Sequence, residues 1–420
     1  MTVAGEIIQL KRASYTLCSP LATSSYGVVW RAWSEGRAVA LKLVNLAKMQ
    51  QAQADLQHNW IASAEQEIAF LQQLSPWDQR HIARLLDHGE YQSLPAFALE
   101  LHEENLHRHL HKLKQQGQRP SPDACLTWLS QINQALAKVH QYGWCYLDLK
   151  PANLLLSGTQ LKLVDFGSTA SVGTQNFRGT PNWQAPEQFF PANTTGEDWQ
   201  YSLDYRSDYF VLGAMLYFLV CGLPLRFCSL CGQAYRQHGV WGAQKLRPEE
   251  QVCTLYADEE QLFLQSMRGA NTGESNQTDC GPAADSAAAQ AALALLKQLL
   301  QYQAEQRPHS AMQISRALAQ IRSLSAPKDE PDTAIATAQP SALAAPYTET
   351  EVAWHKLAWW RSHAKALFAD LILACLTLLT CIGLLAIWTL PASAAIESLS
   401  GIDPVEQVET VDFTQFKKER

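Results

Sequence analysis

The sequence has little charge, and its charges of either sign are not concentrated. Charged residues make up 17% of the 420 residues, the formal net charge is −7, and the lysines and arginines form no run. A basic surface is the usual electrostatic sign of nucleic-acid binding, so we expect no nucleic-acid partner. The N-terminus also lacks the basic and then apolar pattern of a secretory signal peptide.

The cysteines lack the regular spacing of a secreted disulfide framework. There are ten of them, scattered along the chain, which favours reduced intracellular thiols. Cys228 and Cys231 have the spacing of half a zinc site, but no second well-spaced pair follows. A metal there would need ligands such as Cys221 or Cys253. We favour the alternative, in which the pair serves as two small apolar residues.

One long segment lacks charge altogether. The stretch from Leu371 to Leu390 is uncharged and has no polar stripe, and as a helix it would match the ~30 Å hydrocarbon core of a bilayer. We predict a transmembrane helix over 367–390. Basic residues precede it and mostly acidic residues follow, so the large N-terminal part should be cytoplasmic and the tail, 391–420, outside.

Two polar segments lack apolar periodicity. Residues 326–352, rich in Ala, Pro, Thr and acidic residues, are predicted to be a flexible juxtamembrane linker. Residues 268–286 are predicted to be a mobile loop within a helical region.

The first hundred residues read as strands with one helix. The runs YGVVWRAW and RAVALKLV are separated by a turn signal at 34–36, which indicates a hairpin. The second run carries Lys42, and a lysine on a buried strand is costly unless it is paired. Glu67, followed by apolar residues at helical spacing, is the expected partner, and Glu65 is its rival.

A short polar loop carries the strongest signal. The stretch YLDLKPANLLL (146–156) places Asp148, Lys150 and Asn153 close together. A string of this kind could be an exposed turn before a strand. However, the strand-like LKLV and the sequence Asp165-Phe166-Gly167 follow at a fitting distance, and Ala-Pro-Glu stands at 185–187.

This set of motifs resembles the protein serine/threonine kinase family in its bacterial membrane-anchored form. The resemblance implies an α+β, bilobal protein kinase fold over 15–325, with a small β-rich N-lobe (about 15–101) and a larger, mainly helical C-lobe (about 102–325). The linker and a single transmembrane helix would follow, placing the protein in the cell inner membrane.

The resemblance also implies a role for each motif residue. Asp148 would accept the proton of the substrate hydroxyl, and Lys150 would neutralise the transferred phosphate. Asn153 and Asp165 would hold Mg²⁺, or Mn²⁺, through hard oxygen ligands. The residues implied for ATP are Leu21, Ala22, Thr23, Ser24, Gly27, Val29, Ala40, Lys42, Glu67, Glu100, Leu101 and Leu155.

The phosphate-covering loop is poor in glycine. Aligned on Lys42, the family's glycine-rich pattern falls on 22–29, where only Gly27 and Val29 match it. Further on, the strand-like FALEL would form the hinge, with Leu99 as gatekeeper and the backbone of Glu100 and Leu101 bonding adenine.

The catalytic loop departs from the common form His-Arg-Asp at two positions, Tyr146 and Leu147. In the family the arginine pairs with a phosphate on the activation segment, and leucine cannot do so. We therefore expect activity that does not depend on phosphorylation of that segment. The resemblance further pairs Glu187 with Arg307. It places Asp208 at the start of a buried helix, for which a second membrane span is the rival interpretation.

We predict an active kinase whose partners are protein substrates, with the chain itself as a candidate. The alternative is a catalytically weak pseudokinase that serves as a nucleotide-binding scaffold. A small-molecule phosphotransferase of similar fold would lack the Ala-Pro-Glu segment. The span gives no support for dimerisation, because Gly383 alone does not make a small-residue packing motif.

Overall fold

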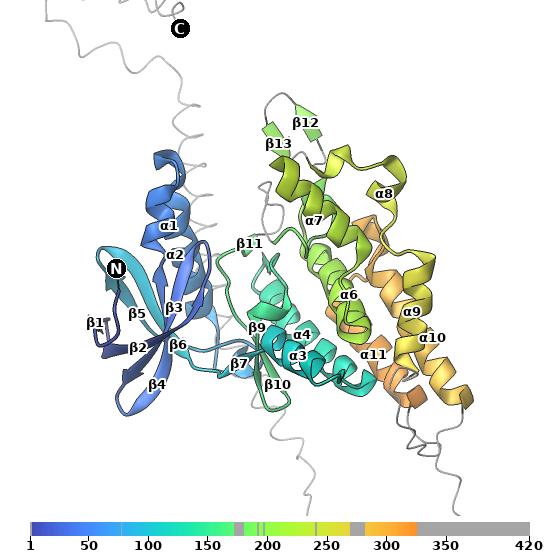
Figure 1. The fold of residues 1–420 in the computed structure, drawn as a ribbon, viewed down its shortest axis with the longest axis horizontal. Coiled ribbons are helices and arrows are strands. Elements are labelled where there is room, and N and C mark those ends of the chain that lie inside the picture. Colours follow the sequence, from blue (N-terminus) through green and yellow to red (C-terminus); the bar gives the residue numbers. More distant parts are fainter. Residues whose placement is uncertain are drawn as a thin grey trace, which may run out of the picture. The chain divides into compact units, whose positions relative to one another are not determined.

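The computed structural model describes residues 2–76, 78–171, 180–190, 193–195, 198–239, 242–268 and 282–325. Within these ranges a β-rich N-lobe precedes a mainly helical C-lobe, as predicted (Figure 1). The predicted linker, transmembrane helix and tail all lie outside the described residues.

The N-lobe is an antiparallel six-stranded sheet in the order β1-β2-β3-β4-β6-β5. The predicted hairpin is present, since β3 pairs with β4 along its whole length. Its turn, Glu35-Gly36, has φ values of 50° and 77°, and two left-handed residues give the tight turn that suits the twist of paired strands. The strands are β1 (Ile7–Gln9), β2 (Ser14–Thr23), β3 (Gly27–Ser34), β4 (Arg37–Val44), β5 (Leu85–Tyr91) and β6 (Leu94–Glu100).

The register of the sheet determines which side chains lie on each of its two faces. Val29 and Phe97 lie opposite Lys42, and Ala40 lies opposite Leu99. Directly opposed residues share a face, as do alternate residues of one strand, so all five side chains are on one face. The other face forms a separate apolar core from Trp30, Ala32, Val39, Leu41, Leu43, Ala96 and Ala98 with strands β1 and β2.

Helix α2 (His58–Gln73) packs on the face that carries Lys42. Its Phe70 and Leu71 are buried in one cluster with Phe97 and Leu99 of the sheet. A short helix, α1 (Leu46–Gln51), precedes it. This packing brings a helix directly behind the lysine strand, as pairing of Lys42 with a helix glutamate requires.

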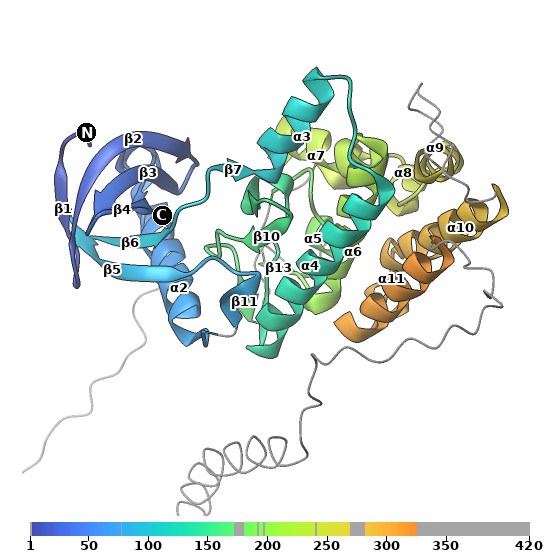
Figure 2. The same ribbon diagram turned by 90° about the horizontal axis from the view of Figure 1, so that it is seen from below.

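The C-lobe is built around α6 (Tyr205–Cys221). Of its 17 residues, 14 are buried inside the lobe, so this apolar helix is a core helix. Figure 2 shows α4 and α6 side by side, with α10 and α11 packed next to them. The other helices are α3 (Leu106–Gln115), α4 (Pro122–Gln141), α5 (Pro186–Phe189), α7 (Arg226–His238), α8 (Pro248–Val252), α9 (Ala257–Met267), α10 (Pro282–Leu299) and α11 (Ala311–Ser325).

The remaining strands, from residue 104 onward, are short. They form three small sheets, β10-β9-β7, β11-β8 and β12-β13. Their bounds are β7 (Glu104–Asn105), β8 (Trp144–Cys145), β9 (Leu154–Ser157), β10 (Gln160–Leu163), β11 (Ala170–Ser171), β12 (Asn193–Thr195) and β13 (Asp198–Gln200).

Across the described ranges, no single helix is long and apolar enough to cross a membrane. Helices α6 and α7 together have a suitable length and composition, but the chain bends by 111° between them.

Two boundaries differ from those predicted. The sheet includes β1, which lies before residue 15. The predicted loop 268–286 is too long, because α10 already begins at Pro282, while 269–281 lie outside the described residues. The sequence from Ala283 onward is rich in alanine, the best helix former, and this outweighs its few polar residues.

A buried ion pair fixes the end of the activation segment. Both guanidinium nitrogens of Arg307 bond the carboxylate of Glu187, at 2.6 and 2.8 Å, as the resemblance implied. The Arg307 side chain is fully buried, and it also donates to the backbone carbonyls of Gln301, Tyr302 and Arg206. A buried charge with all its donors used in this way holds three distant segments in one arrangement.

Cys228 and Cys231 both lie on α7 and are buried in the main apolar core. In the part of the chain that the structure describes, no group of three or more His, Cys, Asp or Glu side chains could hold a metal ion. Burial raises the pKa of the Cys231 thiol to about 12, which keeps it neutral. These side chains act as apolar packing groups.

Candidate active site

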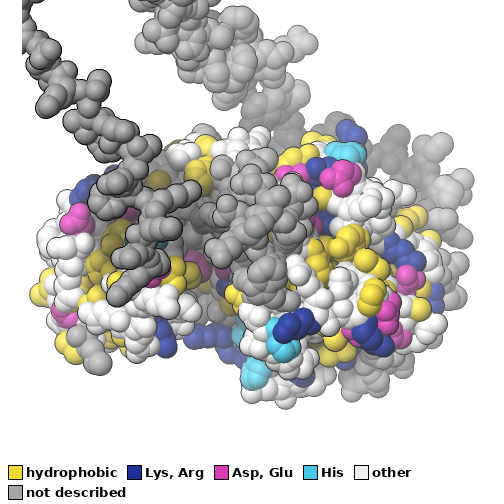
Figure 3. All heavy atoms as spheres, turned by 90° about the horizontal axis from the view of Figure 1, so that it is seen from above, with side chains coloured by type: hydrophobic (Ala, Val, Ile, Leu, Met, Phe, Trp, Pro, Cys, Tyr) yellow, Lys and Arg dark blue, Asp and Glu magenta, His cyan; other side chains and the backbone are white. Residues whose placement is uncertain are grey.

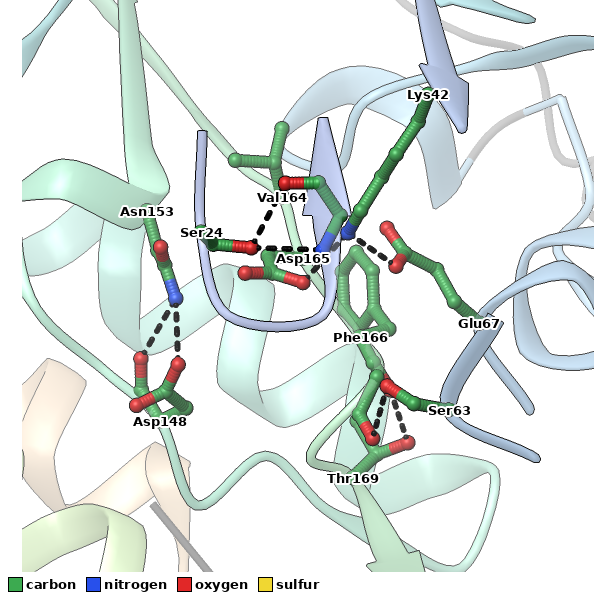
Figure 4. A network of polar contacts seen from close by, with 12 residues as sticks. Ser24, Lys42, Ser63, Glu67, Asp148, Asn153, Val164, Asp165, Phe166 and Thr169 are labelled. Carbon is green, nitrogen blue, oxygen red and sulfur yellow. Dashed lines mark hydrogen bonds and ion pairs between the residues drawn. The ribbon is translucent and has the colours of Figure 1, made fainter. Parts of the chain in front are cut away.

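Lys42 stands between two carboxylates from different parts of the chain (Figure 4). Its Nζ lies 2.6 Å from Oε2 of Glu67 on α2 and 2.7 Å from Oδ1 of Asp165. The rival Glu65 is exposed on the outer side of the same helix. The predicted pairing of Lys42 with Glu67 is therefore present, and the lysine also meets the predicted metal ligand.

Lys42 and Asp165 stabilise each other's charged form. Burial by itself lowers the pKa of Lys42, but Asp165 and Glu67 outweigh that effect and raise it well above its usual value. Burial likewise raises the pKa of Asp165, yet the charge of Lys42 lowers it overall. Ammonium and carboxylate are thus both held in their charged forms at neutral pH.

Helix α2 is also attached to the segment that follows Asp165. The hydroxyl of Ser63 donates to the carbonyl of Gly167 at 3.2 Å, and Gln66 donates to Oγ1 of Thr169 at 2.9 Å. A side chain at position 167 would place its Cβ 2.3 Å from Ser63 Oγ, so it would displace the Ser63 hydroxyl from this contact. These contacts keep Glu67 directed at Lys42.

An aromatic column joins α2 to the catalytic loop. Phe166 stacks on Phe70 of α2 at 4.6 Å between ring centroids and meets Tyr146 edge-on at 5.4 Å. The hydroxyl of Tyr146 donates to the carbonyl of Val164 at 2.5 Å. Tyrosine at the usual histidine position therefore fills an apolar site and still has a partner for its polar tip.

The catalytic loop gathers three polar side chains around Asp148. Lys150 Nζ lies 2.7 Å from Asp148 Oδ2 and 2.8 Å from the hydroxyl of Thr180. That hydroxyl donates to Asp148 Oδ1 at 2.5 Å. Burial raises the pKa of Asp148, against the opposing charge of Lys150, which makes its carboxylate a better proton acceptor than an exposed one.

Asn153 is fixed by the same loop. Its amide nitrogen donates to the carbonyl and to Oδ2 of Asp148, both at 3.0 Å, and this leaves the amide oxygen on the opposite side (Figure 4). A carboxylate oxygen of Asp165 and this amide oxygen are the hard ligands that a divalent cation prefers. The two residues thus fit the metal role predicted for them.

Asp208 holds the catalytic loop in an uncommon conformation. Its two carboxylate oxygens accept the backbone N–H groups of Tyr146 and Leu147, each at 2.7 Å, and one of them lies 2.8 Å from His140 Nε2. Leu147 has φ of 64° and Asp165 has φ of 65°, left-handed values that cost a non-glycine residue about 1–3 kcal/mol. The bonds that Asp208 accepts offset that cost at Leu147.

The match to known proteins agrees with this geometry. A family model described as the protein kinase domain matches residues 15–318. The chain belongs to the protein kinase family.

Curated relatives support the serine/threonine group. The chain is 27% identical over 245 residues to the dual specificity protein kinase TTK of Mus musculus, covering 56% of this chain and 27% of that protein. It is 35% identical over 114 residues to a probable cAMP-dependent protein kinase catalytic subunit of Encephalitozoon cuniculi, covering 26% and 32%. It is 39% identical over 107 residues to the DNA damage-responsive serine/threonine-protein kinase RqkA of Deinococcus radiodurans, covering 24% and 15%. The chain thus spans less than a third of the length of each of these three relatives.

Three of the apolar side chains predicted around adenine lie on one face of the N-lobe sheet. Val29 and Ala40 are half-buried on the sheet face of Lys42, Leu99 is buried beside them, and Leu155 of β9 and Leu101 are half-buried. Half-buried apolar side chains of this kind offer surface that a planar base can cover.

The hinge is more constrained than the sequence indicated. The N–H of Glu100 already donates to the carbonyl of Arg84 at 3.1 Å, so this N–H is not available to adenine. Burial would raise the pKa of the Glu100 carboxyl, but the nearby His102 and the bonds from Lys162 and the Arg84 N–H lower it to about 2. Because Lys162 lies on β10, this ion pair links the hinge to the C-lobe.

The phosphate-covering loop connects β2 to β3 as a closed turn. The hydroxyl of Ser24 bonds the N–H and the carbonyl of Gly27, and the N–H of Ser24 donates to that carbonyl at 2.8 Å. Ala22, Thr23 and Ser24 are exposed at its tip. At its start, the carbonyl of Leu21 accepts a bond from Arg108 of α3 at 3.1 Å.

Two residues that the motifs did not reveal hold this loop in place. Asn45 is buried, and it donates from its side chain to the Ser24 carbonyl at 2.8 Å and from its N–H to the Tyr26 carbonyl at 3.0 Å. Trp60 of α2 donates its indole N–H to the Ser25 carbonyl at 2.8 Å, and its ring lies 5.0 Å from that of Tyr26. An asparagine before a helix is a common capping signal, but nothing in the sequence around Trp60 marks its contact with the loop.

We predict that Trp60→Phe weakens ATP use more than it slows the chemical step. The substitution keeps an aromatic ring beside Tyr26 but removes one hydrogen bond, whose net worth is about 0.5–1.5 kcal/mol. We expect the KM for Mg-ATP to rise about two- to tenfold, with kcat within about twofold of the wild type, in steady-state assays. Trp33→Phe, at an exposed tryptophan of β3, is the matched control. A Trp60 variant with an unchanged KM would contradict this role.

Proposed function

We propose that the protein is an active serine/threonine kinase that transfers the γ-phosphoryl group of Mg-ATP to hydroxyls of protein substrates. The observation that carries the proposal is the position of Lys42, whose amine contacts Glu67 and Asp165 at the same time. This arrangement leaves the strand amine and the metal-binding carboxylate side by side, where the phosphates of one nucleotide can reach both.

The chain's own residues account for the remaining steps. Asp148 Oδ1 already accepts a hydrogen bond from one alcohol, that of Thr180, so it is placed to orient a substrate hydroxyl and take its proton. Lys150, 2.7 Å from the same carboxylate, supplies positive charge where the transferred group passes. Asn153 and Asp165 would hold the divalent cation. When bound, Mg-ATP supplies the phosphoryl group and neutralises much of its charge.

The central test is the transfer of labelled phosphate from ATP to a generic protein substrate, with Asp148→Asn as the comparison. Loss of a general base typically lowers the rate about 10²–10⁴-fold, so we expect at least a 100-fold loss of kcat. Binding of Mg-ATP, followed by calorimetry, should survive in the variant. Equal, very slow transfer by wild type and variant would instead assign the protein to the alternative, a nucleotide-binding scaffold.

We also propose that activity is independent of phosphorylation in the activation segment. The support is Leu147, which is buried in a small apolar cluster with Cys145, Ala170, Tyr201 and Leu203. Ala170 lies near the start of the activation segment, and Tyr201 and Leu203 come after its end. Apolar packing therefore connects the catalytic loop to both sides of the segment, a connection that a phosphate and an arginine would otherwise make. Apolar contacts need no modification to form.

Thr169, Ser171 and Thr174 are the candidate phosphorylation sites of the activation segment, and one of them is inaccessible. Thr169 is fully buried, and its hydroxyl donates to the carbonyl of Phe166 at 2.7 Å, so its replacement would disturb the active site for structural reasons. Ser171 and Thr174 remain as candidates. Thr174 lies outside the described residues, and the side chain of Ser171 is likewise not described.

We predict that phosphatase treatment, or the double change Ser171→Ala and Thr174→Ala, leaves kcat within about twofold of the untreated wild type. Leu147→Ala should lower kcat, because a leucine-to-alanine cavity costs about 2–5 kcal/mol in the cluster that orders the segment. Leu318→Ala, in the α11 core, is a control with a similar cavity away from the segment. A large loss of activity on phosphatase treatment would contradict independence.

We further propose that the kinase is anchored in the bacterial inner membrane through 367–390, with its catalytic domain in the cytoplasm, and acts in membrane-associated signalling. The uncharged stretch from Leu371 to Leu390 and the basic residues before it support this proposal. We expect the full chain to stay in the membrane pellet after alkaline extraction, and a chain lacking 367–390 to be released. Release of the full chain would contradict anchoring.

A further inference from the structure

A groove lies on the C-lobe away from the residues described above. It is bounded by α3, the connection from α3 to α4, and the segment that follows α6, and its volume is about 590 Å³. Its floor is apolar, although it lies at the surface of the lobe. The apolar residues that line it are Leu110, Phe218, Leu219, Leu223 and Pro224.

The rim of this groove is basic. His107 and His111 are one helical turn apart and so lie on the same face of α3. Lys114 and Arg119 continue that edge, and all four side chains are exposed. Among the described residues that line the groove there is no aspartate or glutamate. In the view of Figure 3, histidine side chains lie beside lysine or arginine side chains at the lower edge.

This local charge is opposite to that of the whole chain, which has a net charge of −7. Elsewhere on α3, by contrast, Lys112 is paired with Glu104 at 2.6 Å. A basic rim around an apolar floor is complementary to a segment that carries acidic residues and apolar anchors together.

The groove begins close to the catalytic loop. Helix α3 starts at Leu106, packs against the turn at 151–153, and donates from Arg108 to the phosphate-covering loop. Its ten residues span about 15 Å. A segment bound along α3 could therefore be joined to a hydroxyl at Asp148 by roughly five to ten extended residues, at about 3.3 Å per residue.

We propose that this groove is a docking site for an acidic segment with leucine or phenylalanine anchors on the kinase's protein substrates. This inference rests on the proposed kinase function and names a property of the substrate. The apolar groups line a groove, with Leu223 about half exposed, whereas a membrane-binding face needs apolar groups that project outward. Because the catalytic loop is nearby, a protein segment bound in the groove would bring a hydroxyl of the same protein close to Asp148.

The direct test is binding of a fluorescein-labelled peptide, Glu-Glu-Leu-Phe-Glu-Asp-Leu, to the purified full chain by fluorescence anisotropy. The variant Lys114→Glu/Arg119→Glu reverses the rim charge, and Leu223→Ser removes an apolar contact. Lys11→Glu/Lys245→Glu makes the same change of net charge at exposed lysines outside the groove. We expect the groove reversal to weaken binding about tenfold at low salt and the control to change it less than twofold, with weaker binding as salt rises.

A second measurement separates docking from catalysis. Phosphorylation of a short serine peptide without acidic residues should be the same in the wild type and the groove variants, which shows that they are folded and active. Adding the acidic segment eight residues away should lower KM only for the wild type and the Lys11/Lys245 control. If the wild type transfers no phosphate at all, the proposed function fails, while the anisotropy result still decides whether the groove binds.

Several outcomes would overturn the proposal. Equal binding by the groove variants and the wild type would do so, as would equal binding of a peptide with glutamine and asparagine in place of the acidic residues. Competition by phosphatidylglycerol vesicles that depends on Lys114 and Arg119, without peptide binding, would assign the groove to a membrane surface. Self-association that the same substitutions abolish, again without peptide binding, would assign it to a second copy of the chain.

Discussion

The active site depends on one ammonium group placed between two carboxylates. Lys42 can be charged on a buried strand only because Glu67 and Asp165 lie within 2.7 Å of it, and each of these comes from a different element. The position of α2, the conformation after Asp165 and the contact between the lobes must therefore all be correct together. The bonds from Ser63 and Gln66, and the stacking of Phe70 on Phe166, hold α2 in the one position that satisfies this condition.

At position 147 of the catalytic loop, an apolar side chain stands where the family has an arginine that binds a phosphate. Leucine at position 147 cannot bind a phosphate, but its side chain is fully buried among residues from both ends of the activation segment. Its strained φ is maintained by Asp208, which accepts the N–H groups of both Tyr146 and Leu147. An apolar cluster forms whenever the chain folds, whereas a phosphate–arginine pair forms only after a phosphorylation step. The leucine therefore supports the proposal that activity does not depend on phosphorylation of this segment.

Sequence motifs were sufficient where chemistry fixes both residue type and spacing. Lys42 and Asp165 are 123 residues apart, yet the strand lysine and Asp-Phe-Gly predicted their meeting, and the apolar pattern after Glu67 distinguished it from Glu65. Contacts made by backbone groups could not be predicted in this way. The Glu100 N–H donates to the carbonyl of Arg84, the residue before β5, and the indole N–H of Trp60 on α2 donates to the Ser25 carbonyl. The helical start at Pro282 was missed because polar residues in an alanine-rich run resemble a loop.

The poverty of glycine in the phosphate-covering loop need not weaken nucleotide binding. Glycine allows a backbone to approach phosphates closely, but it also has the greatest conformational freedom to lose when a ligand orders it. Here Ser24 closes the turn through Gly27, and Asn45 at the start of α1 binds the Ser24 carbonyl. Trp60 of α2, the helix that carries Glu67, binds the Ser25 carbonyl. A loop that is ordered before the ligand arrives loses less entropy on binding, at about 1–2 kcal/mol for each residue that need not be fixed. With few glycines the loop approaches the phosphates less closely, which weakens nucleotide binding, but it also loses less entropy when the nucleotide binds. The bonds that anchor this loop add to the second effect and so favour binding.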